Sequence, residues 1–312
     1  MLLPLRCLFR RLLLGAAALL MASHAAGQSV AFTFDDGPHL HDTPRLNAAA
    51  RNQALLDTLA KHQVKAALFV TAGNGANRPE GLALARAWGD AGHAIGNHTM
   101  THPDLHKAGV TLAQYQQELL DCDAIIRTLP GYRKWFRFPY LREGNTAAKR
   151  DGMRDFLKAQ GYSNAYVTLD TSDWRLNDKL VAVLGRDPDA DVLAIKRIYL
   201  AHILQRAQAY RELSHHLQGR DIAQVLLLHH NLINALWLGD VIAMFKAQGW
   251  TIVSPGQAFA DPVYRLQPER AAPGQSLLLS MARSLGLSQF DGLDRLVDDA
   301  DFEIELLKRL GY

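Results

Sequence analysis

The chain has 312 residues, 48% of them hydrophobic, and its 34 Lys and Arg residues nearly balance its 31 Asp and Glu residues. This length and composition are typical of one large globular domain or two small ones. A net charge of only +3 gives no reason to expect nucleic acid as a partner.

The first 27 residues have the order of a secretory signal peptide. Three arginines at 6–11 precede an apolar run at 12–21, and small residues follow at 22–27. The run is too short to span a hydrocarbon core of about 30 Å as a helix. We therefore expect cleavage after Ala25 or Gly27 and a secreted or periplasmic protein with no membrane span after signal removal. A retained membrane anchor is the alternative.

Short apolar runs and helical patterns alternate along the body of the chain. The apolar runs predict strands at 30–34, 66–70, 94–96, 135–138, 165–169, 225–228 and 250–253. The helical patterns predict helices at 43–62, 112–129, 191–216 (capped by Asp191) and 236–248. This alternation predicts an α/β fold whose parallel sheet has helices outside and is either open or closed into a barrel.

Two segments extend beyond this alternation. Residues 177–220 are predicted as a helical insertion between two strands, because their helical pattern is unusually long. Residues 261–312 begin with several prolines and continue as an amphipathic helical pattern. We interpret them as a C-terminal extension that either packs on the main domain at 28–260 or holds a partner.

Polar residues of catalytic type follow five of the predicted strands. The carboxyl ends of parallel strands are where α/β folds build their sites. Folding requirements alone do not explain five such strand ends. The residues are Asp35, Asp36, His98, Arg137, Tyr140, Asp170, Asp173, His229 and His230.

The pair Asp35 and Asp36 predicts a metal site, because adjacent carboxylates repel each other unless a cation offsets them. His98 and His102 lie four residues apart, and Pro103 favours a turn entering a helix there. One carboxylate with two imidazoles leaves open positions on a metal such as zinc, which suits catalysis.

The second carboxylate of the pair is then free to act as a base on water. Arg137 is expected to hold that carboxylate through a bidentate ion pair and keep it ionised. Without a metal, we expect one of the two carboxylates to take up a proton.

His229 and His230 are competing candidates for an acid that protonates a leaving group. Side chains alternate along a strand, so only one of the two faces the site. The remaining histidines, His202 among them, are interpreted as surface residues or as residues that support the site from behind.

Five motifs in this order resemble the signature of the polysaccharide deacetylases with a NodB-homology domain, carbohydrate esterase family four. They are TFDDGP, HTMTH, RFPY, DTSDW and LLLHH, and the resemblance covers roughly residues 30–255. It implies a distorted (β/α) barrel, here with about seven parallel strands, and metal-dependent removal of acetyl groups from N-acetylated sugars.

The resemblance also implies roles for the metal side of the site. Asp35 resembles the catalytic base, and Arg137 resembles the residue that orients it. The metal ligands would be Asp36, His98 and His102, with zinc the first choice and cobalt, nickel, iron or manganese as alternatives.

On the acid side, His229 resembles the catalytic acid and Asp173 the carboxylate that tunes it. Trp174 and Leu227 resemble the walls of the acetyl pocket. The backbone N–H of Tyr140 resembles the group that helps to hold the oxyanion. The sequence departs from the family after Arg137, where FPYLRE lacks the usual Gly, and in the insertion and the extension.

The leading hypothesis is therefore a secreted, metal-dependent deacetylase acting on peptidoglycan, a chitooligosaccharide or a similar acetylated carbohydrate. An acetyl esterase on O-acetylated polysaccharide such as acetylxylan is the main alternative. A non-catalytic carbohydrate-binding module is disfavoured, since binding alone needs neither base nor acid. An Fe(II) oxygenase built on two histidines and a carboxylate is disfavoured by the adjacent Asp pair and the parallel-sheet pattern.

Overall fold

The structure is a computed structural model that describes residues 27–269, 275–287, 296 and 298–312. The signal peptide predicted at 1–27 lies, except for Gly27, outside the described residues and stays a prediction. Within the described ranges, no helix is long and apolar enough to cross a membrane.

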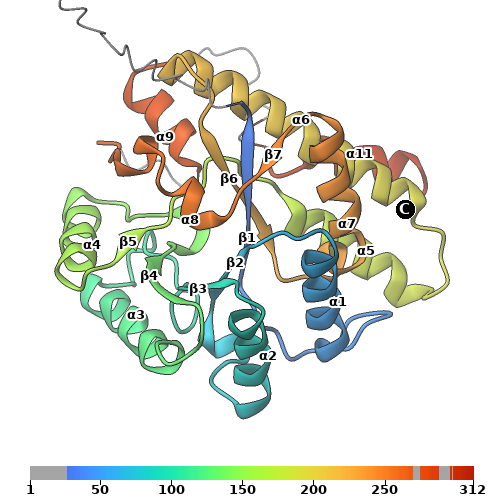
Figure 1. Cartoon of the computed structure of the whole chain (residues 1–312), viewed down its shortest axis with the longest axis horizontal. Coiled ribbons are helices and arrows are strands. Elements are labelled where there is room, and N and C mark those ends of the chain that lie inside the picture. The colour runs from blue at the N-terminus through green and yellow to red at the C-terminus, as the bar shows by residue number, and fades with distance from the viewer. Residues whose placement is uncertain (1–26, 270–274, 288–295, 297) are drawn as a thin grey trace, which may run out of the picture.

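Seven parallel strands form the centre of the described chain (Figure 1). Their order is β5-β4-β3-β2-β1-β6, and β7 also pairs with β1. A parallel bridge between Leu169 and Leu226 joins the segment after β5 to β6, so the sheet curls into a distorted barrel. The predicted (β/α) barrel with about seven parallel strands is confirmed. The strands are β1 (Ser29–Asp35), β2 (Ala67–Val70), β3 (Ala94–Asn97), β4 (Tyr132–Phe136), β5 (Ser163–Asn164), β6 (Ala223–His229) and β7 (Thr251–Ile252).

Strand β1 pairs with β2, β6 and β7 and is buried along its whole length. Its apolar run allows this, because a strand covered on both faces must bury both sets of side chains. β1 pairs with β6 in a continuous register that ends with Asp35 opposite His229. The two strands thus bring residues 194 positions apart to one sheet edge.

Helices cover the outside of the barrel, and polar caps set where several of them begin. Helix α1 begins at Ala48, later than predicted, because residues 43–46 form a turn and Asn47 caps the helix by accepting a hydrogen bond from the Ala50 amide at 2.8 Å. Helix α7 begins earlier than predicted, because Asn231 caps it. The helices are α1 (Ala48–Lys61), α2 (Pro79–Asp90), α3 (Leu112–Ile126), α4 (Ala147–Ala159), α7 (Leu232–Ala247) and α8 (Pro255–Ala258), with 3-10 turns η1 (Ala72–Asn74), η2 (Pro139–Leu141) and η3 (Pro262–Arg265).

The strand predicted at 165–169 is wrong. The regular strand β5 ends at Asn164, before this stretch begins. The Ala165 amide donates to Phe136 O on β4, whereas the Leu169 amide donates to Val225 O on β6. The segment crosses from one neighbour to the other, so no continuous ladder forms along it. It closes the barrel as an irregular link.

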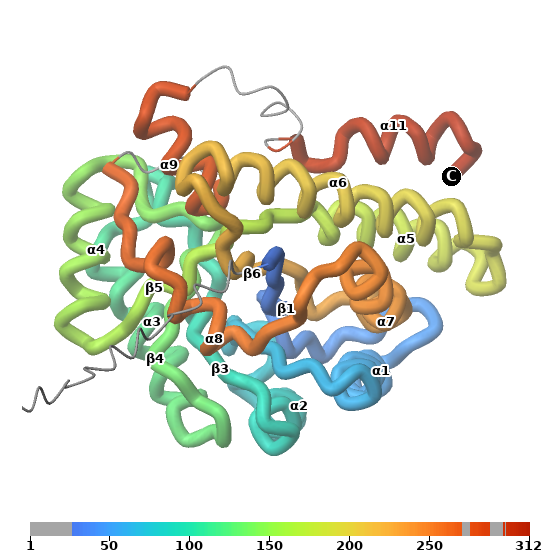
Figure 2. Tube along the Cα trace, turned by 45° about the horizontal axis from the view of Figure 1, so that its top comes forward, coloured from blue at the N-terminus to red at the C-terminus, as the bar shows by residue number. Residues whose placement is uncertain are grey.

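The predicted insertion and C-terminal extension are helical and lie against each other (Figure 2). The insertion contains most of α5 (Asp173–Arg186) and all of α6 (Leu193–Gln218), and the Asp191 carboxylate accepts a hydrogen bond from the Leu193 amide at 2.9 Å. The extension contains α9 (Leu277–Ser284) and α11 (Asp301–Arg309). Both pack on α6, and their buried leucines join the main core.

Candidate active site

Three side chains of types that can bind a metal meet near the carboxyl ends of β1 and β3. Asp36 Oδ1 lies 3.3 Å from His102 Nε2 and 3.4 Å from His98 Nε2. One ligand atom from each residue lies within 4.8 Å of the others. His102 sits in a loop with a left-handed φ of 59°, and no described helix begins between His102 and α3, so the expected helix entry at Pro103 is wrong.

The chemistry of this trio fits a cation. His98 Nδ1 contacts the Arg137 carbonyl at 2.8 Å, so Nδ1 carries the proton and the Nε2 lone pair faces Asp36. Asp36 Oδ1 is buried, and no described residue donates a hydrogen bond to it. Electron-pair donors that converge on one point without a shared proton favour a bound cation. One carboxylate with two imidazoles is a common zinc donor set.

Asp35 lies beside the trio and is 2% exposed. Arg137 Nη1 donates to Asp35 Oδ1 at 2.7 Å and to Thr33 Oγ1 at 2.7 Å, while Arg137 Nε donates to Ala165 O at 3.0 Å. The expected ion pair is present. Its bidentate form is wrong, because the arginine divides its donors among three partners.

The two adjacent carboxylates titrate differently. Burial raises the pKa of Asp35 to about 6, although the Arg137 charge opposes this. Burial also acts to raise the pKa of Asp36, but the charges of His229, His102 and His98 prevail and lower it. Of the two, Asp35 is therefore the carboxylate that takes up a proton first when no cation is bound.

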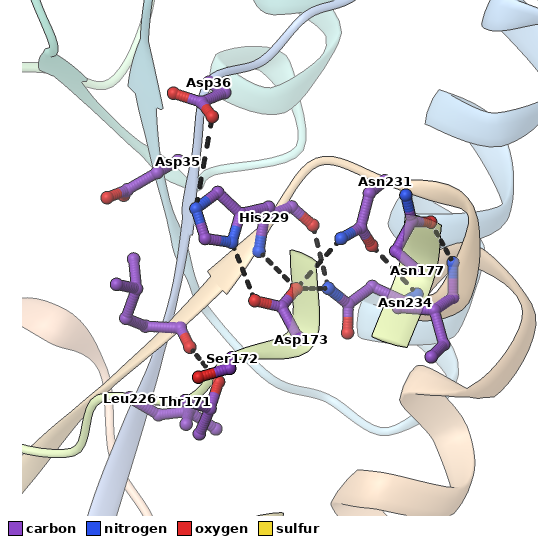
Figure 3. A network of polar contacts seen from close by, with 12 residues as sticks. Asp35, Asp36, Thr171, Ser172, Asp173, Asn177, Leu226, His229, Asn231 and Asn234 are labelled. Atoms are coloured by element: carbon purple, nitrogen blue, oxygen red, sulfur yellow. Dashed lines mark hydrogen bonds and ion pairs between the residues drawn. The ribbon is translucent and has the colours of Figure 1, made fainter. Parts of the chain in front are cut away.

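His229 faces the two carboxylates from β6 (Figure 3). Its Nδ1 lies 2.7 Å from Asp173 Oδ1, and its Nε2 lies 4.0 Å from Asp36 Oδ2. Burial lowers the pKa of His229, but Asp173 and the two β1 carboxylates raise it, with a net result of about 10. The neighbouring carboxylates therefore favour the protonated form of the imidazole.

Asp173 is fully buried, and three further donors fix it in place. Its Oδ2 accepts hydrogen bonds from the His229 amide at 2.9 Å, Asn231 Nδ2 at 3.0 Å and Asn234 Nδ2 at 2.7 Å (Figure 3). The two asparagines were not identified from the sequence. Asn231 had one available signal, since it is a preferred N-cap residue directly before a helical pattern.

His230 points away from the site, as the alternation along a strand requires. Its Nε2 lies 2.9 Å from Asn52 Oδ1, and its ring packs near Trp88 with centroids 6.1 Å apart. His230 is 1% exposed. Of the two competing histidines, only His229 faces Asp36.

A cavity of about 530 Å³ opens over these groups. Eight of the ten residues that were assigned a role from the sequence line it, while Arg137 and Asp173 support it from behind. Tyr140 has a left-handed φ of 57°, and its ring lies 4.5 Å from that of His102. Tyr140 and Trp174 are half-exposed at the rim, whereas Leu227 is buried in the wall. The eight are Asp35, Asp36, His98, His102, Tyr140, Trp174, Leu227 and His229.

Further residues, to which the sequence assigned no role, line the cavity. Asp170 follows a predicted strand but had no assigned role, and burial raises its pKa to about 7. Asp299 comes from the C-terminal extension. No motif marks Asp299, because its place at the cavity depends on how the extension packs.

Known proteins resemble this chain in sequence and in fold. The profile of the family described as polysaccharide deacetylase matches residues 22–162. A peptidoglycan-N-acetylglucosamine deacetylase of Bacillus cereus is 33% identical over 147 residues, which cover 47% of this chain and 46% of that protein. A chitin deacetylase of Colletotrichum lindemuthianum is 31% identical over 184 residues, covering 55% of this chain and 66% of that protein.

The chain thus spans about half the length of the first relative and about two thirds of the second. Among solved structures, wild-type BA3943 of Bacillus anthracis, described as a CE4 family pseudoenzyme, matches with a TM-score of 0.51 and 19% identity. That match covers 75% of this chain and 66% of the other, and at this identity it concerns the fold alone. The sequence relatives and the barrel agree, and residues 22–162 of the chain match the polysaccharide deacetylase family with NodB homology.

Proposed function

We propose that this protein is a secreted, metal-dependent deacetylase that hydrolyses the acetamide of an N-acetylated sugar or polysaccharide. The observation that carries the proposal is the placement of Asp35 and His229. They are cross-strand partners at one sheet edge, they line the same cavity, and the Asp36 trio lies beside them. Relatives named for deacetylation of peptidoglycan and chitin support this substrate class.

Asp36, His98 and His102 would hold the metal, with zinc as the first choice for this donor set. A divalent cation bound there lowers the pKa of a bound water and polarises the acetyl carbonyl oxygen. Because a nearby positive charge favours the ionised form of a carboxyl group, binding also lowers the pKa of Asp35.

Asp35 accepts the proton of the attacking water in this proposal. Arg137 holds one carboxylate oxygen at 2.7 Å, which leaves Asp35 Oδ2 as the atom that takes the proton. Arg137 is itself fixed by Thr33, by the Ala165 carbonyl and by the face of Phe69 at 3.9 Å. The base is therefore oriented before substrate arrives, which is how positioned groups contribute to catalysis.

His229 donates the proton that the departing nitrogen needs. Its Nδ1 is occupied by Asp173, so Nε2 is the atom that faces the cavity and carries the transferable proton. An amine leaves an acyl carbon only after protonation, so an acid with a raised pKa fits cleavage of a C–N bond.

Trp174, Leu227 and Tyr140 surround the acetyl group. Leu227 gives the pocket a buried apolar wall, and half-exposed Trp174 extends it to the rim. The Tyr140 N–H is proposed as the donor to the developing oxyanion. The left-handed turn at Tyr140 places this residue at the cavity next to His102.

Secretion is proposed from the basic, apolar and small-residue order of the first 27 residues. The proposed substrates are components of cell walls or their fragments, which lie outside the cytoplasm.

The test is acetate release, followed by mass spectrometry, from chitooligosaccharides, peptidoglycan fragments and acetylxylan, with metal analysis of the same sample. We expect mass loss corresponding to acetyl on one of the N-acetyl substrates, with about one metal ion per chain. Turnover confined to acetylxylan would instead make the protein an O-acetyl esterase. Full activity of metal-free protein would refute the proposal.

A further inference from the structure

A chain of hydrogen bonds joins the C-terminal extension to the edge of the catalytic cavity. Glu303 Oε1 on α11 lies 2.8 Å from His202 Nδ1 on α6. His202 Nε2 in turn accepts a hydrogen bond from the Ser172 amide at 3.2 Å. His202 is 1% exposed and Ser172 is 4% exposed, so both contacts lie away from water.

These hydrogen bonds allow only one protonation pattern for a neutral His202 imidazole. A backbone N–H only donates, so His202 Nε2 must accept from Ser172. The proton of the ring is then on Nδ1, which donates to the Glu303 carboxylate. Both ends of the imidazole are specified, and the ring cannot turn without losing one of the two bonds.

The Ser172 end of the chain lies directly next to the proposed acid machinery. Ser172 is the N-cap residue of α5, yet its side chain makes no capping bond. The next two residues are Asp173, which holds His229, and Trp174, which forms the pocket rim. A buried amide needs a hydrogen-bond acceptor, and within the described chain His202 supplies it.

Other contacts from the extension converge on the same stretch of chain. Ser172 Oγ donates to the Asp298 carbonyl at 3.5 Å, and Asp301 Oδ1 lies 2.5 Å from Arg175 Nη2. Arg206 on α6 donates to the Leu296 carbonyl at 2.9 Å. The extension thus contacts the turn before α5 from the outside while Asp299 lines the cavity.

We propose that His202 and Glu303 are positioning residues for the acid side of the active site. They hold the Ser172 amide and thereby fix Asp173 against His229 and Trp174 at the rim. This inference rests on the proposed deacetylase reaction and extends it, because it assigns a role to the insertion and the C-terminal extension. Neither residue contacts the reacting atoms.

A merely structural role would predict a different result from a positioning role. A structural brace lowers the folded fraction and the melting temperature but leaves kcat per folded molecule unchanged. A positioning residue lowers kcat more than it raises KM, because substrate binding survives while proton donation is misaligned. The side chains allow a conservative rescue, since a glutamine amide both accepts and donates hydrogen bonds.

The experiment compares His202→Leu with His202→Gln, and Glu303→Ala with Glu303→Gln, in the full chain. For Leu and Ala we expect kcat to fall about 10- to 100-fold, as for other residues that orient a catalytic group. KM should change by less than about threefold, and the two Gln variants should recover most of kcat. Glu305→Ala is the matched control, because Glu305 lies on the same helix and pairs only with exposed Lys308 among the described residues.

A second readout does not depend on turnover. In ¹⁵N-labelled protein, the amide signals of Ser172 and Asp173 should shift in His202→Leu and Glu303→Ala but not in Glu305→Ala. Metal content should stay at the wild-type level in all five variants. If His202→Leu does not fold, the Glu303 pair carries the same test, because the Glu303 side chain is 12% exposed and less deeply packed.

An unchanged kcat in folded His202→Leu and Glu303→Ala would overturn the inference, as would unshifted Ser172 and Asp173 amides. Loss of kcat that neither glutamine variant restores would also count against it. If the wild-type protein released no acetate from any substrate, the deacetylase proposal would fail first. The amide signals would then still decide whether the hydrogen-bond chain holds the Ser172 turn.

Discussion

The two walls of the cavity are built in different ways. The metal wall, defined as Asp36, His98 and His102, comes from strand ends and a loop within 67 sequence positions. The acid wall, defined as Asp173, Trp174 and His229, lies wholly beyond the segment that matches the family profile. Its residues depend on contacts with α6, α7 and the C-terminal extension. One wall is thus set by local motifs and the other by tertiary packing.

The largest effects are expected from replacing the two adjacent carboxylates, Asp35 and Asp36, which should behave differently. Asp36→Ala should lose both the bound metal and measurable acetate release, because only two protein ligands remain. Asp35→Asn is the matched control of similar size, and it should keep the metal while kcat falls about 10²- to 10⁴-fold. Metal analysis and acetate assays on both variants check this. Equal metal content in the two variants would contradict the assigned division of roles.

Removal of the acid should disable the acid wall without affecting metal binding at the metal wall. His229→Ala should retain the metal and lower kcat about 10²- to 10⁴-fold, because His229 is the proposed proton donor. His230→Gln is the control, since His230 faces Asn52 and Trp88, and its kcat should stay near the wild-type value. Comparable losses in both variants would argue against His229 as the acid.

A pH profile tests whether Asp173 raises the pKa of His229. Burial lowers the pKa of His229, and Asp173 outweighs it, so the net pKa is raised to about 10. In Asp173→Asn the burial effect prevails, the pKa falls, and the protonated form is lost at lower pH. The alkaline limb of kcat/KM should therefore move towards neutral by about 1–3 pH units. An alkaline limb that stays in place would remove Asp173 from this role.

The raised pKa of His229 also affects the stability of the folded protein. A histidine whose pKa is raised from 6.5 on folding stabilises the native state fully below pH 6.5. That contribution is lost as the pH rises towards 10. Equilibrium urea unfolding of the wild type and Asp173→Asn should therefore differ most at low pH and converge at high pH.

The smallest effect is expected for an exposed contact of the extension. Asp301 pairs with Arg175 at 2.5 Å, but Asp301 is 68% exposed. Asp301→Ala should lower the free energy of unfolding by only about 0.2–1 kcal/mol, because water and salt screen such pairs. Its kcat should match the wild type. A large loss of kcat would show that the extension acts through this surface pair rather than through Glu303.

The sequence predicted the metal wall better than the acid wall, for a physical reason. Asp36, His98 and His102 follow strands in short motifs, so spacing and strand ends suffice to bring them together. The residues alone left His229 and His230 as competing candidates, and only the family resemblance favoured His229 before the strand faces were known. His202 was interpreted as a surface or supporting residue, because its burial depends on α11, about one hundred residues further along. The strand prediction at 165–169 was wrong, because barrel closure decides which two strands this segment contacts.

The register between β1 and β6 fixes how far apart the proposed proton acceptor and donor are. Neighbouring strands lie about 4.8 Å apart, and Asp35 and His229 are direct partners across that gap. This spacing is a property of backbone hydrogen bonds, and it brings the two side chains to one edge of the sheet. In the proposed reaction, the barrel therefore sets the distance between base and acid whatever the length of the polymer. Discrimination among polymers would then depend on other residues that line the cavity, such as Tyr140, Trp174 and Asp299.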